Sequence, residues 1–214
     1  HPKLVSQAIP ISKLSYHEAM ELSHFGAKVI YPPTLQPLID KNIPVIIKNT
    51  FDKEAQGTLI NAKGNPKGDG SIVKGISHID DVVLISLEGS GMIGIPGFSK
   101  RFFECLSQKH INIIMITQAS SEHSICIGVR SQDATLAKKT IDNHFTFEIS
   151  VQKVTAAKIE SNMSNIAVVG DRMKDHQGIS GKLFSSLGAN NINIRAIAQG
   201  ASERNISIVI DKKN

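Results

Sequence analysis

A glutamine followed by a serine and a glutamate occurs twice in the chain, each time after a run of apolar residues. Residues 116–127 read ITQASSEHSICI and residues 197–208 read IAQGASERNISI, which places Gln118 and Gln199 81 positions apart (118 to 199). A glutamine side chain carries a donor and an acceptor on a neutral amide. It can therefore bind a ligand hydroxyl without introducing a charge, and an analogue that lacks the hydroxyl would leave the amide unpaired. The pair indicates a binding role, although a turn in which each glutamine only caps its strand is the alternative.

The segment Gly89–Gly94 has the G-x-G-x-x-G pattern of dinucleotide-binding turns. We reject a dinucleotide site, because the aligned segment that starts at Gly170 keeps only the first glycine. In addition, the next expected strand ends in Gln118 rather than in a ribose-binding acid. Glycines at such a turn favour close approach of the backbone. The same close approach would suit a small carboxylate at the start of the following helix.

The histidines, acids and cysteines form no catalytic or metal-binding pattern. His17, Glu21 and His24 could share one helix face, but their spacing lacks the H-E-x-x-H signature, so a solvated polar face is favoured. No Ser-His-Asp or Cys-His arrangement is visible. We therefore predict no catalytic residue and no metal site. Cys105 and Cys126 are expected to be small buried hydrophobic residues.

The repeat extends well beyond the two glutamines. A fixed spacing of 81 positions, without a gap, is typical of a duplicated structural unit. The same offset aligns Gly89 with Gly170, Met92 with Met173, Gly97 with Gly178, Asn112 with Asn193, Glu122 with Glu203 and Ile125 with Ile206.

The first copy predicts the order βαββαβ from its apolar periodicity. The expected elements are a strand at 82–87, a glycine-rich turn at 89–97, a helix at 98–109, strands at 111–117 and 124–129, a helix at 134–144 and a closing strand at 151–159. Phe102, Phe103 and Leu106 are expected on the inner face of the first helix.

The second copy predicts a strand at 166–169, a helix at 179–187 and strands at 192–198 and 206–210, and it stops before a second helix or a fourth strand. A sheet that lacks a strand exposes unpaired backbone groups. We expect the β-branched run at 43–48 to complete this sheet, so that the first copy is inserted within the second.

The N-terminal part predicts a helix at 14–28, with Ser15 and Glu18 as a capping box and Gly26 at its end. A short helical turn is expected at 34–41 and an exposed linker at 61–71.

Composition limits the class of protein. The net charge is +5, but the basic residues are scattered, so we predict no nucleic-acid partner. No apolar run is long enough to cross a bilayer, and we predict no membrane partner. Two cysteines and the lack of an export signal favour the cytoplasm.

Residues 15–37 (SYHEAMELSHFGAKVIYPPTLQP), residues 43–60 (IPVIIKNTFDKEAQGTLI) and the two repeats, in this order, resemble the C-terminal part of aspartokinases, above all the bifunctional aspartokinase–homoserine dehydrogenases. The resemblance implies an α+β fold with tandem ferredoxin-like βαββαβ (ACT) domains and a short helical tail of an α/β kinase domain. It implies a kinase tail at 1–42, a first ACT domain at 80–159 and a discontinuous second ACT domain at 43–79 and 160–214.

The resemblance also implies a function. Aspartokinases phosphorylate the β-carboxylate of aspartate with ATP and Mg²⁺, and their ACT pair senses an end-product amino acid. In threonine-sensitive members the glutamines that match Gln118 and Gln199 bind threonine. Further effector contacts are expected from Gly91, Met92, Ile93, Gly94, Asn112 and Ser121.

Other implications concern the kinase and the assembly. Lys3 and Lys28 match positions near ATP, but the rest of the kinase site is absent, so we expect no kinase activity and no cofactor in this chain. We expect a homo-oligomer through ACT–ACT pairing. The alternatives are a lysine-sensing regulatory region and an RNA-binding module, and the second is disfavoured because the central strands INIIMIT and SICIGV contain no aromatic residue for stacking.

Overall fold

The computed structural model describes residues 5–24, 30–64, 72–118, 122–200 and 204–214. The chain forms two compact units. Unit 1 comprises residues 1–79, 166–192 and 199–208, and unit 2 comprises residues 80–165, 193–198 and 209–214. Among the described residues, no helix has the length and apolar character needed to cross a membrane.

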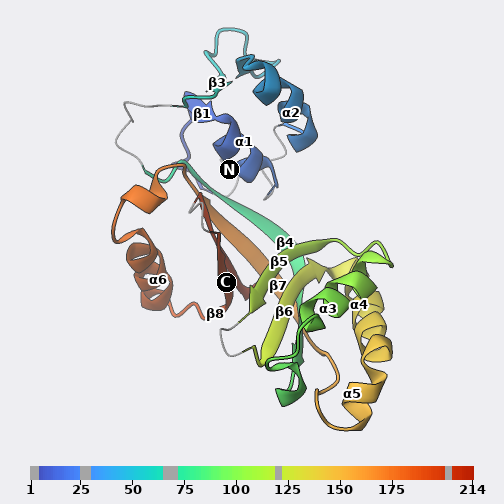
Figure 1. The fold of residues 1–214 in the computed structure, drawn as a ribbon. Helices are drawn as coiled ribbons and strands as arrows, with labels where there is room; N and C mark the ends of the chain where they lie inside the picture. The colour runs from blue at the N-terminus through green and yellow to red at the C-terminus, as the bar shows by residue number, and fades with distance from the viewer. Residues whose placement is uncertain (1–4, 25–29, 65–71, 119–121, 201–203) are drawn as a thin grey trace. The chain divides into compact units, whose positions relative to one another are not determined.

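The first repeat has the predicted βαββαβ order. Strand β4 (Gly75–Glu88) leads through the 3-10 turn η2 (Ser90–Met92) into helix α3 (Phe98–Ser107). Strands β5 (Ile113–Gln118) and β6 (Ser124–Arg130) follow, then helices α4 (Ser131–His144) and α5 (Thr146–Ser150), and strand β7 (Lys158–Val169). Helices α3 and α4 lie side by side next to β6 (Figure 1).

The core of unit 2 lies between these helices and their sheet. β4 and β5 each pair antiparallel with β6, and Val82 opposite Arg130 and Glu88 opposite Ser124 fix the register of β4. Alternate residues of a strand share one face, and the buried alternate residues of β4 and β6 pack under α3 and α4. They are Val83, Ile85 and Leu87 of β4 and Ile125, Ile127 and Val129 of β6.

Helix α3 covers this core with the residues that its periodicity predicts. Phe102 and Leu106 are fully buried, whereas Phe103 is partly buried and packs at the margin. At the start of the helix, the ring of Phe98 stacks on Phe145 with 4.8 Å between the centroids.

The second repeat copies the first in backbone conformation as well as in sequence. It consists of the second half of β7, η3 (Met173–Asp175), α6 (Ile179–Ala189), β8 (Ile194–Gln199) and β9 (Asn205–Asp211). β8 and β9 begin and end 81 positions after β5 and β6. Three aligned pairs share a positive φ: Gly97 and Gly178 (84° and 85°), Asp81 and Asn162 (58° and 61°), and His110 and Asn191 (54° and 56°).

The expectation that residues 43–48 complete the second repeat's sheet is wrong. That segment forms β2 (Val45–Ile47), which pairs antiparallel with β3 (Thr58–Asn61). β1 (Lys13–Ser15) pairs parallel with the other edge of β3, and the three strands make a separate sheet in the order β1-β3-β2. A run of β-branched residues predicts a strand but not its partner, so the local pattern could not reveal this pairing.

Strand β4 supplies the missing strand instead. The large sheet has the order β5-β6-β4-β7-β9-β8, so β4 and β7 are neighbours, and both strands pass through both units. The Lys74 N–H donates to Val169 O at 2.8 Å, and 81 positions later the Thr155 N–H donates to Glu88 O, also at 2.8 Å. The chain before β4 therefore closes the second repeat as the chain before β7 closes the first.

Two further boundaries differ from the sequence prediction. The closing strand expected at 151–159 begins only at Lys158, because residues 146–150 form α5 and the segment after it turns through Gln152, at φ 57°. The predicted turn at 34–41 is the end of a ten-residue helix, α2 (Pro32–Lys41). Proline is tolerated in the first helical turn, where its missing N–H has no partner to lose.

The predicted capping box is present at the start of α1 (Tyr16–Leu22). Ser15 Oγ accepts the Glu18 N–H, and Glu18 Oε2 accepts the Ser15 N–H. The expected helix end at Gly26 and residues 65–71 of the predicted linker lie outside the described residues.

The closure of the second repeat can be tested at Gly170. A Cβ on Gly170 would lie 2.2 Å from Ile72 O, whereas a Cβ on Gly181, inside α6, would meet nothing within 4 Å. We expect Gly170→Ala to lower the free energy of unfolding by about 1–3 kcal/mol, because backbone atoms must move apart. Gly181→Ala is the matched control and should raise it by about 0.5–1 kcal/mol, since alanine favours a helix. Urea denaturation measures both, and an equal effect of the two substitutions would contradict the close approach of residue 72.

Candidate functional site

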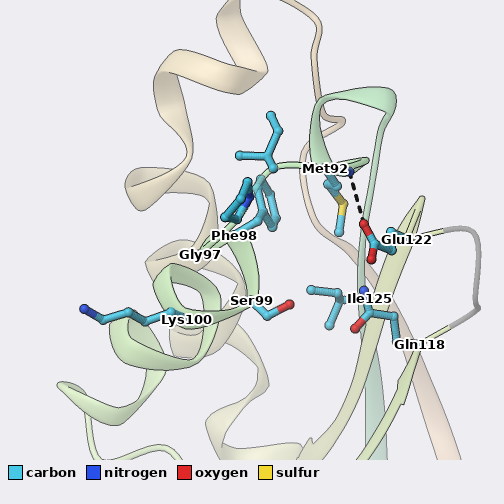
Figure 2. A pocket seen from close by; sticks show the side chains of 11 residues that line it. Met92, Gly97, Phe98, Ser99, Lys100, Gln118, Glu122 and Ile125 are labelled. Carbon is cyan, nitrogen blue, oxygen red and sulfur yellow. Dashed lines mark hydrogen bonds between the residues drawn. The ribbon is translucent and has the colours of Figure 1, made fainter.

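Unit 2 contains a pocket of about 410 Å³. Its walls come from the turn after β4, the first turn of α3, the end of β5 and the start of β6 (Figure 2). The sequence predicted three of its lining residues, Gln118, Met92 and Gly94. The full lining is Met92, Gly94, Ile95, Pro96, Gly97, Phe98, Ser99, Lys100, Gln118, Glu122 and Ile125.

The first turn of α3 gives the pocket a positive end. Gly97 is the N-cap at φ 84° and ψ 0°, and no side chain caps the helix. The first N–H groups of an α-helix have no acceptor within the helix, and with the helix dipole they favour an anion. The Ser99 hydroxyl points across the pocket toward Ile125 and Gln118, whereas the Lys100 side chain points away (Figure 2). This wall is suited to a carboxylate.

The opposite wall carries a neutral amide and an acid. Gln118 is the last residue of β5 and lies opposite Ile125 of β6, so both side chains reach the pocket from one face of the sheet. Glu122, at φ 53°, accepts the Gly94 N–H on Oε2 at 3.1 Å. This bond joins the β5–β6 connection to the turn after β4. The carboxylate also places a negative charge at the rim, where it would favour an ammonium group.

The floor of the pocket is apolar. Met92, Phe98 and Ile125 line it and are themselves buried in the core. The walls therefore match a ligand with an anionic group toward α3 and a cationic group toward Glu122. An α-amino acid carries both groups.

Three of the first-copy residues predicted for effector contact, Gly91, Ile93 and Asn112, do not line this pocket. The Gly91 N–H donates to Lys153 O at 2.9 Å, and a Cβ on Gly91 would lie 2.5 Å from Lys153 Cβ. A glycine is therefore needed at position 91 to leave room for Lys153, which is a structural reason and not a ligand contact. Ile93 and Asn112 are exposed. Ser121, Lys3 and Lys28 lie outside the described residues.

Sequence reasoning did not assign Glu122 or Ser99 to the site. In the sequence, Glu122 stands out only as one half of an aligned pair with Glu203. The repeated Ser-Glu after each glutamine was the available signal, but the backbone bond from Gly94 to Glu122 could not be read from it. Ser99 carried no signal, because a serine in a first helical turn is common.

The second copy keeps part of this arrangement. Gln199 ends β8 and is exposed, and Gly178 starts α6 with the same left-handed conformation as Gly97. The turn differs, however, because Asp175 stands at the position of Gly94 and Gly181 at that of Lys100. Glu203, the counterpart of Glu122, lies outside the described residues.

Glu21, on the polar face of α1, takes part in a hydrogen bond to the second repeat. Glu21 Oε2 accepts the Asn205 Nδ2 amide at 2.6 Å. Within the part of the chain that the structure describes, no three His, Cys, Asp or Glu side chains are arranged to hold a metal ion.

Comparison with known proteins places these features in a family. A sequence model of the ACT domain matches residues 85–145 and 166–214. The bifunctional aspartokinase/homoserine dehydrogenase of Haemophilus influenzae is 44% identical over 209 residues, which are 98% of this chain and 25% of that protein. A chloroplastic bifunctional aspartokinase/homoserine dehydrogenase of Zea mays is 40% identical over 215 residues, 100% of this chain and 23% of that protein. The chain thus spans about a quarter of the length of these curated relatives.

Solved structures agree with this result. The crystal structure of Clostridium acetobutylicum aspartate kinase superposes with a TM-score of 0.86 at 27% identity, over 100% of this chain and 48% of that one. E. coli aspartokinase III in complex with lysine and aspartate (T-state) gives a TM-score of 0.73 at 26% identity, over 99% of this chain and 45% of that one. The tandem ferredoxin-like ACT fold predicted from the sequence is confirmed.

Cys126 follows Ile125 on β6, and the pH dependence of its reaction with an alkylating reagent tests how far its thiol is buried. Burial, with smaller contributions from Glu160 and Glu88, raises the pKa of the Cys126 thiol to about 11. Since only the thiolate reacts, iodoacetamide should alkylate Cys126 at pH 8 about 100-fold more slowly than an exposed cysteine. The rate should still rise between pH 9 and 11. The Cys105→Ala variant leaves this single thiol for the measurement, and a rate that levels off below pH 9 would contradict the burial.

Proposed function

We propose that this chain, which belongs to the ACT domain family, is the regulatory region of an aspartokinase and binds L-threonine. Its similarity to bifunctional aspartokinase/homoserine dehydrogenases over nearly its whole length supports the first part. The pocket bounded by α3 and Gln118 supports the second. In the longer protein, threonine would inhibit the ATP-dependent phosphorylation of aspartate, with ATP and Mg²⁺ bound by the kinase region rather than by this chain.

The proposed domain division comes from the resemblance to aspartokinases, corrected by the strand pairing. Residues 1–42 would be the tail of the amino-acid kinase domain, and residues 43–61 share the small sheet of β1 rather than the sheet of the second repeat. Residues 80–159 would be the first ACT domain, and residues 160–214 with the chain at 72–79 the second. The start of β4, not β2, supplies the last strand of the second domain.

The ligand pose follows from the charges on the pocket walls. The threonine carboxylate would meet the N–H groups of Ser99 and Lys100 in the first turn of α3, and its ammonium would approach Glu122. The side-chain hydroxyl would then pair with the Gln118 amide, and its methyl group would contact Met92 and Ile125. Each wall satisfies one group of the ligand. The single observation that carries this proposal is the placement of Gln118 and the α3 N-terminus in one pocket.

A second candidate ligand is lysine, and Glu122 is the observation that favours it. A carboxylate at the rim could hold a side-chain ammonium, and the E. coli aspartokinase III cited above was solved with lysine. The two ligands make different demands on Gln118. A neutral amide gains from a hydroxyl, while an ammonium gains more from an acid, so comparison of amino acids separates the two.

Inhibition requires that the ligand bind one of two states more tightly, because equal affinity shifts no equilibrium. We propose a homo-oligomer as the setting for this change. The edge strands β5 and β8 carry exposed apolar residues at matching positions, Ile116 (49% exposed) and Ile197 (42%). An open edge with apolar side chains is suited to pairing with a second copy. We place the protein in the cytoplasm and propose neither a nucleic-acid nor a membrane partner.

The hydroxyl-reading role of Gln118 is tested by isothermal titration calorimetry with threonine and valine, which have nearly the same shape. We expect threonine to bind about tenfold or more tightly than valine, because valine leaves the amide unpaired. Gln118→Ala should remove this preference at the first copy. The matched control is Gln132→Ala, an exposed glutamine on α4, which should bind like the unsubstituted chain. If lysine binds tighter than threonine, the lysine alternative replaces our assignment.

The charge-reading role of Glu122 gives a separate expectation. In Glu122→Gln the amide can still accept the Gly94 N–H, but the negative charge at the rim is lost. We expect threonine affinity to fall about tenfold, since charged hydrogen bonds contribute more than neutral ones. The difference in affinity between the two chains should shrink with rising salt, because Glu122 is exposed and salt screens its charge. Unchanged affinity in the first-copy site would exclude Glu122 as the ammonium partner.

A further inference from the structure

Helix α1 is bonded at its N-terminus to the turn that opens the second copy. Glu18 is 4% exposed and accepts two backbone N–H groups, from Ser15 on Oε2 at 2.8 Å and from Asp171 on Oε1 at 3.2 Å. Ser15 Oγ accepts the Glu18 N–H at 3.0 Å and donates to the Asp171 carboxylate. The capping box therefore has a third member that lies 156 positions away in the sequence.

A second group of bonds joins α1 to the start of β9. Asn205 Nδ2 donates to Glu21 Oε2 at 2.6 Å. Arg204 Nε lies 3.1 Å from Asp171 Oδ1, and Arg204 O accepts the Gly170 N–H at 2.9 Å. All of these residues belong to unit 1. We call this set, Ser15, Glu18, Glu21, Asp171, Arg204 and Asn205, the α1 clamp.

The clamp engages the part of the second copy that matches the ligand pocket of the first. Asp171 aligns with Ser90, which opens the turn that supplies Met92 and Gly94 to the pocket. Arg204 and Asn205 lie between Gln199 and the rest of β9. The counterparts of Asp171, Arg204 and Asn205 in the first copy are Ser90, His123 and Ser124. The charged partners of the clamp are therefore features of the second copy alone.

Helix α1 and the turn at 171–175 stabilise each other through the clamp. Helix α1 has seven residues, too few to be stable without contacts elsewhere. The Glu18 carboxylate is buried, and removing the Asp171 N–H from it would leave a buried acceptor without this partner. A displacement of the turn at 171–175 would thus weaken the N-cap of α1, and loss of α1 would release the turn.

We propose that the α1 clamp positions the turn at 171–175 for binding of an amino acid by the second copy, and that ligand binding there stabilises α1 in return. The reciprocity follows from thermodynamic linkage between two coupled events. Glu18 is a positioning residue in this scheme, since it acts through Asp171. The inference rests on the proposed function, because it assigns the same class of ligand to the second copy. It makes α1 the element that reports occupancy of that copy to the N-terminal part of the chain.

Hydrogen exchange followed by mass spectrometry tests the clamp in the 214-residue chain. The Gln118→Ala background weakens the first-copy site, so that added threonine acts mainly through the second. At a threonine concentration that fills the second copy, we expect the amides of α1 to exchange about tenfold more slowly. The amides of α2 should change less, because none of the clamp residues belongs to that helix. Adding Glu18→Gln should abolish the slowing and weaken threonine binding, whereas Glu54→Gln, an exposed acid in the same unit, should do neither.

Calorimetry on the same samples separates the outcomes. No heat with threonine in the unsubstituted chain would contradict the proposed function and the clamp together. Heat in the unsubstituted chain but none in Gln118→Ala, or heat in both with unchanged exchange in α1, would overturn only the clamp. If Glu18→Gln unfolds α1 without ligand, Asp171→Asn, which keeps the backbone N–H to Glu18, provides the second variant. It should reduce the slowing partly, and retention of the full effect would overturn the role of the Asp171 carboxylate.

Discussion

The structure depends on two long strands that each serve both copies of the repeat. β4 has 14 residues and β7 has 12, and each carries a non-glycine residue at positive φ at the same repeat position, Asp81 and Asn162. Such a residue interrupts regular pairing and marks a change of direction in a strand. Asp and Asn are the residues that tolerate this conformation best. The start of β4 lies beside β7 and supplies the strand that the second copy's own segment lacks.

This sharing explains which parts of the fold the sequence could predict. The boundaries of α3, β5, β6, α6, β8 and β9 agree with prediction to within two residues or so, because each element carries its own apolar periodicity and the repeat supplies it twice. The partner of a strand is a long-range property. The run at 43–48 is a strand, yet its place beside β3 depends on β1 and β3 rather than on its own residues. Helix α5 displaced the predicted closing strand for a related reason, since Phe145 is anchored by contacts with Phe98 and Phe102 of α3.

A site residue could be predicted where the same residue type recurs at the same position of both repeats while its neighbours differ. Gln118 was found because the same amide recurs after an apolar strand at the same offset. The glycines were harder to interpret. Gly91 is required where the backbone passes Lys153, so its lack of a Cβ serves the fold, whereas Gly94 lines the pocket and donates to Glu122. One glycine-rich motif therefore combines a structural position with a functional one, and only geometry separates them.

In the proposed binding mode, the pocket divides recognition of an amino acid into a general and a selective part. The N-terminus of α3 and the Glu122 carboxylate match groups that every α-amino acid carries, so they can provide affinity but little choice among amino acids. Choice must come from Gln118 and the apolar floor of Met92 and Ile125, which meet the side chain. The second copy keeps the glutamine and the glycine-capped helix but changes the turn, where Asp171 bonds to α1 and Asp175 replaces Gly94. In the proposed scheme, selectivity and coupling thus reside in different residues of one repeated unit. The turn could change in the second copy while the amide stayed, because a contact to α1 at the turn leaves the position at the end of β8 unaltered.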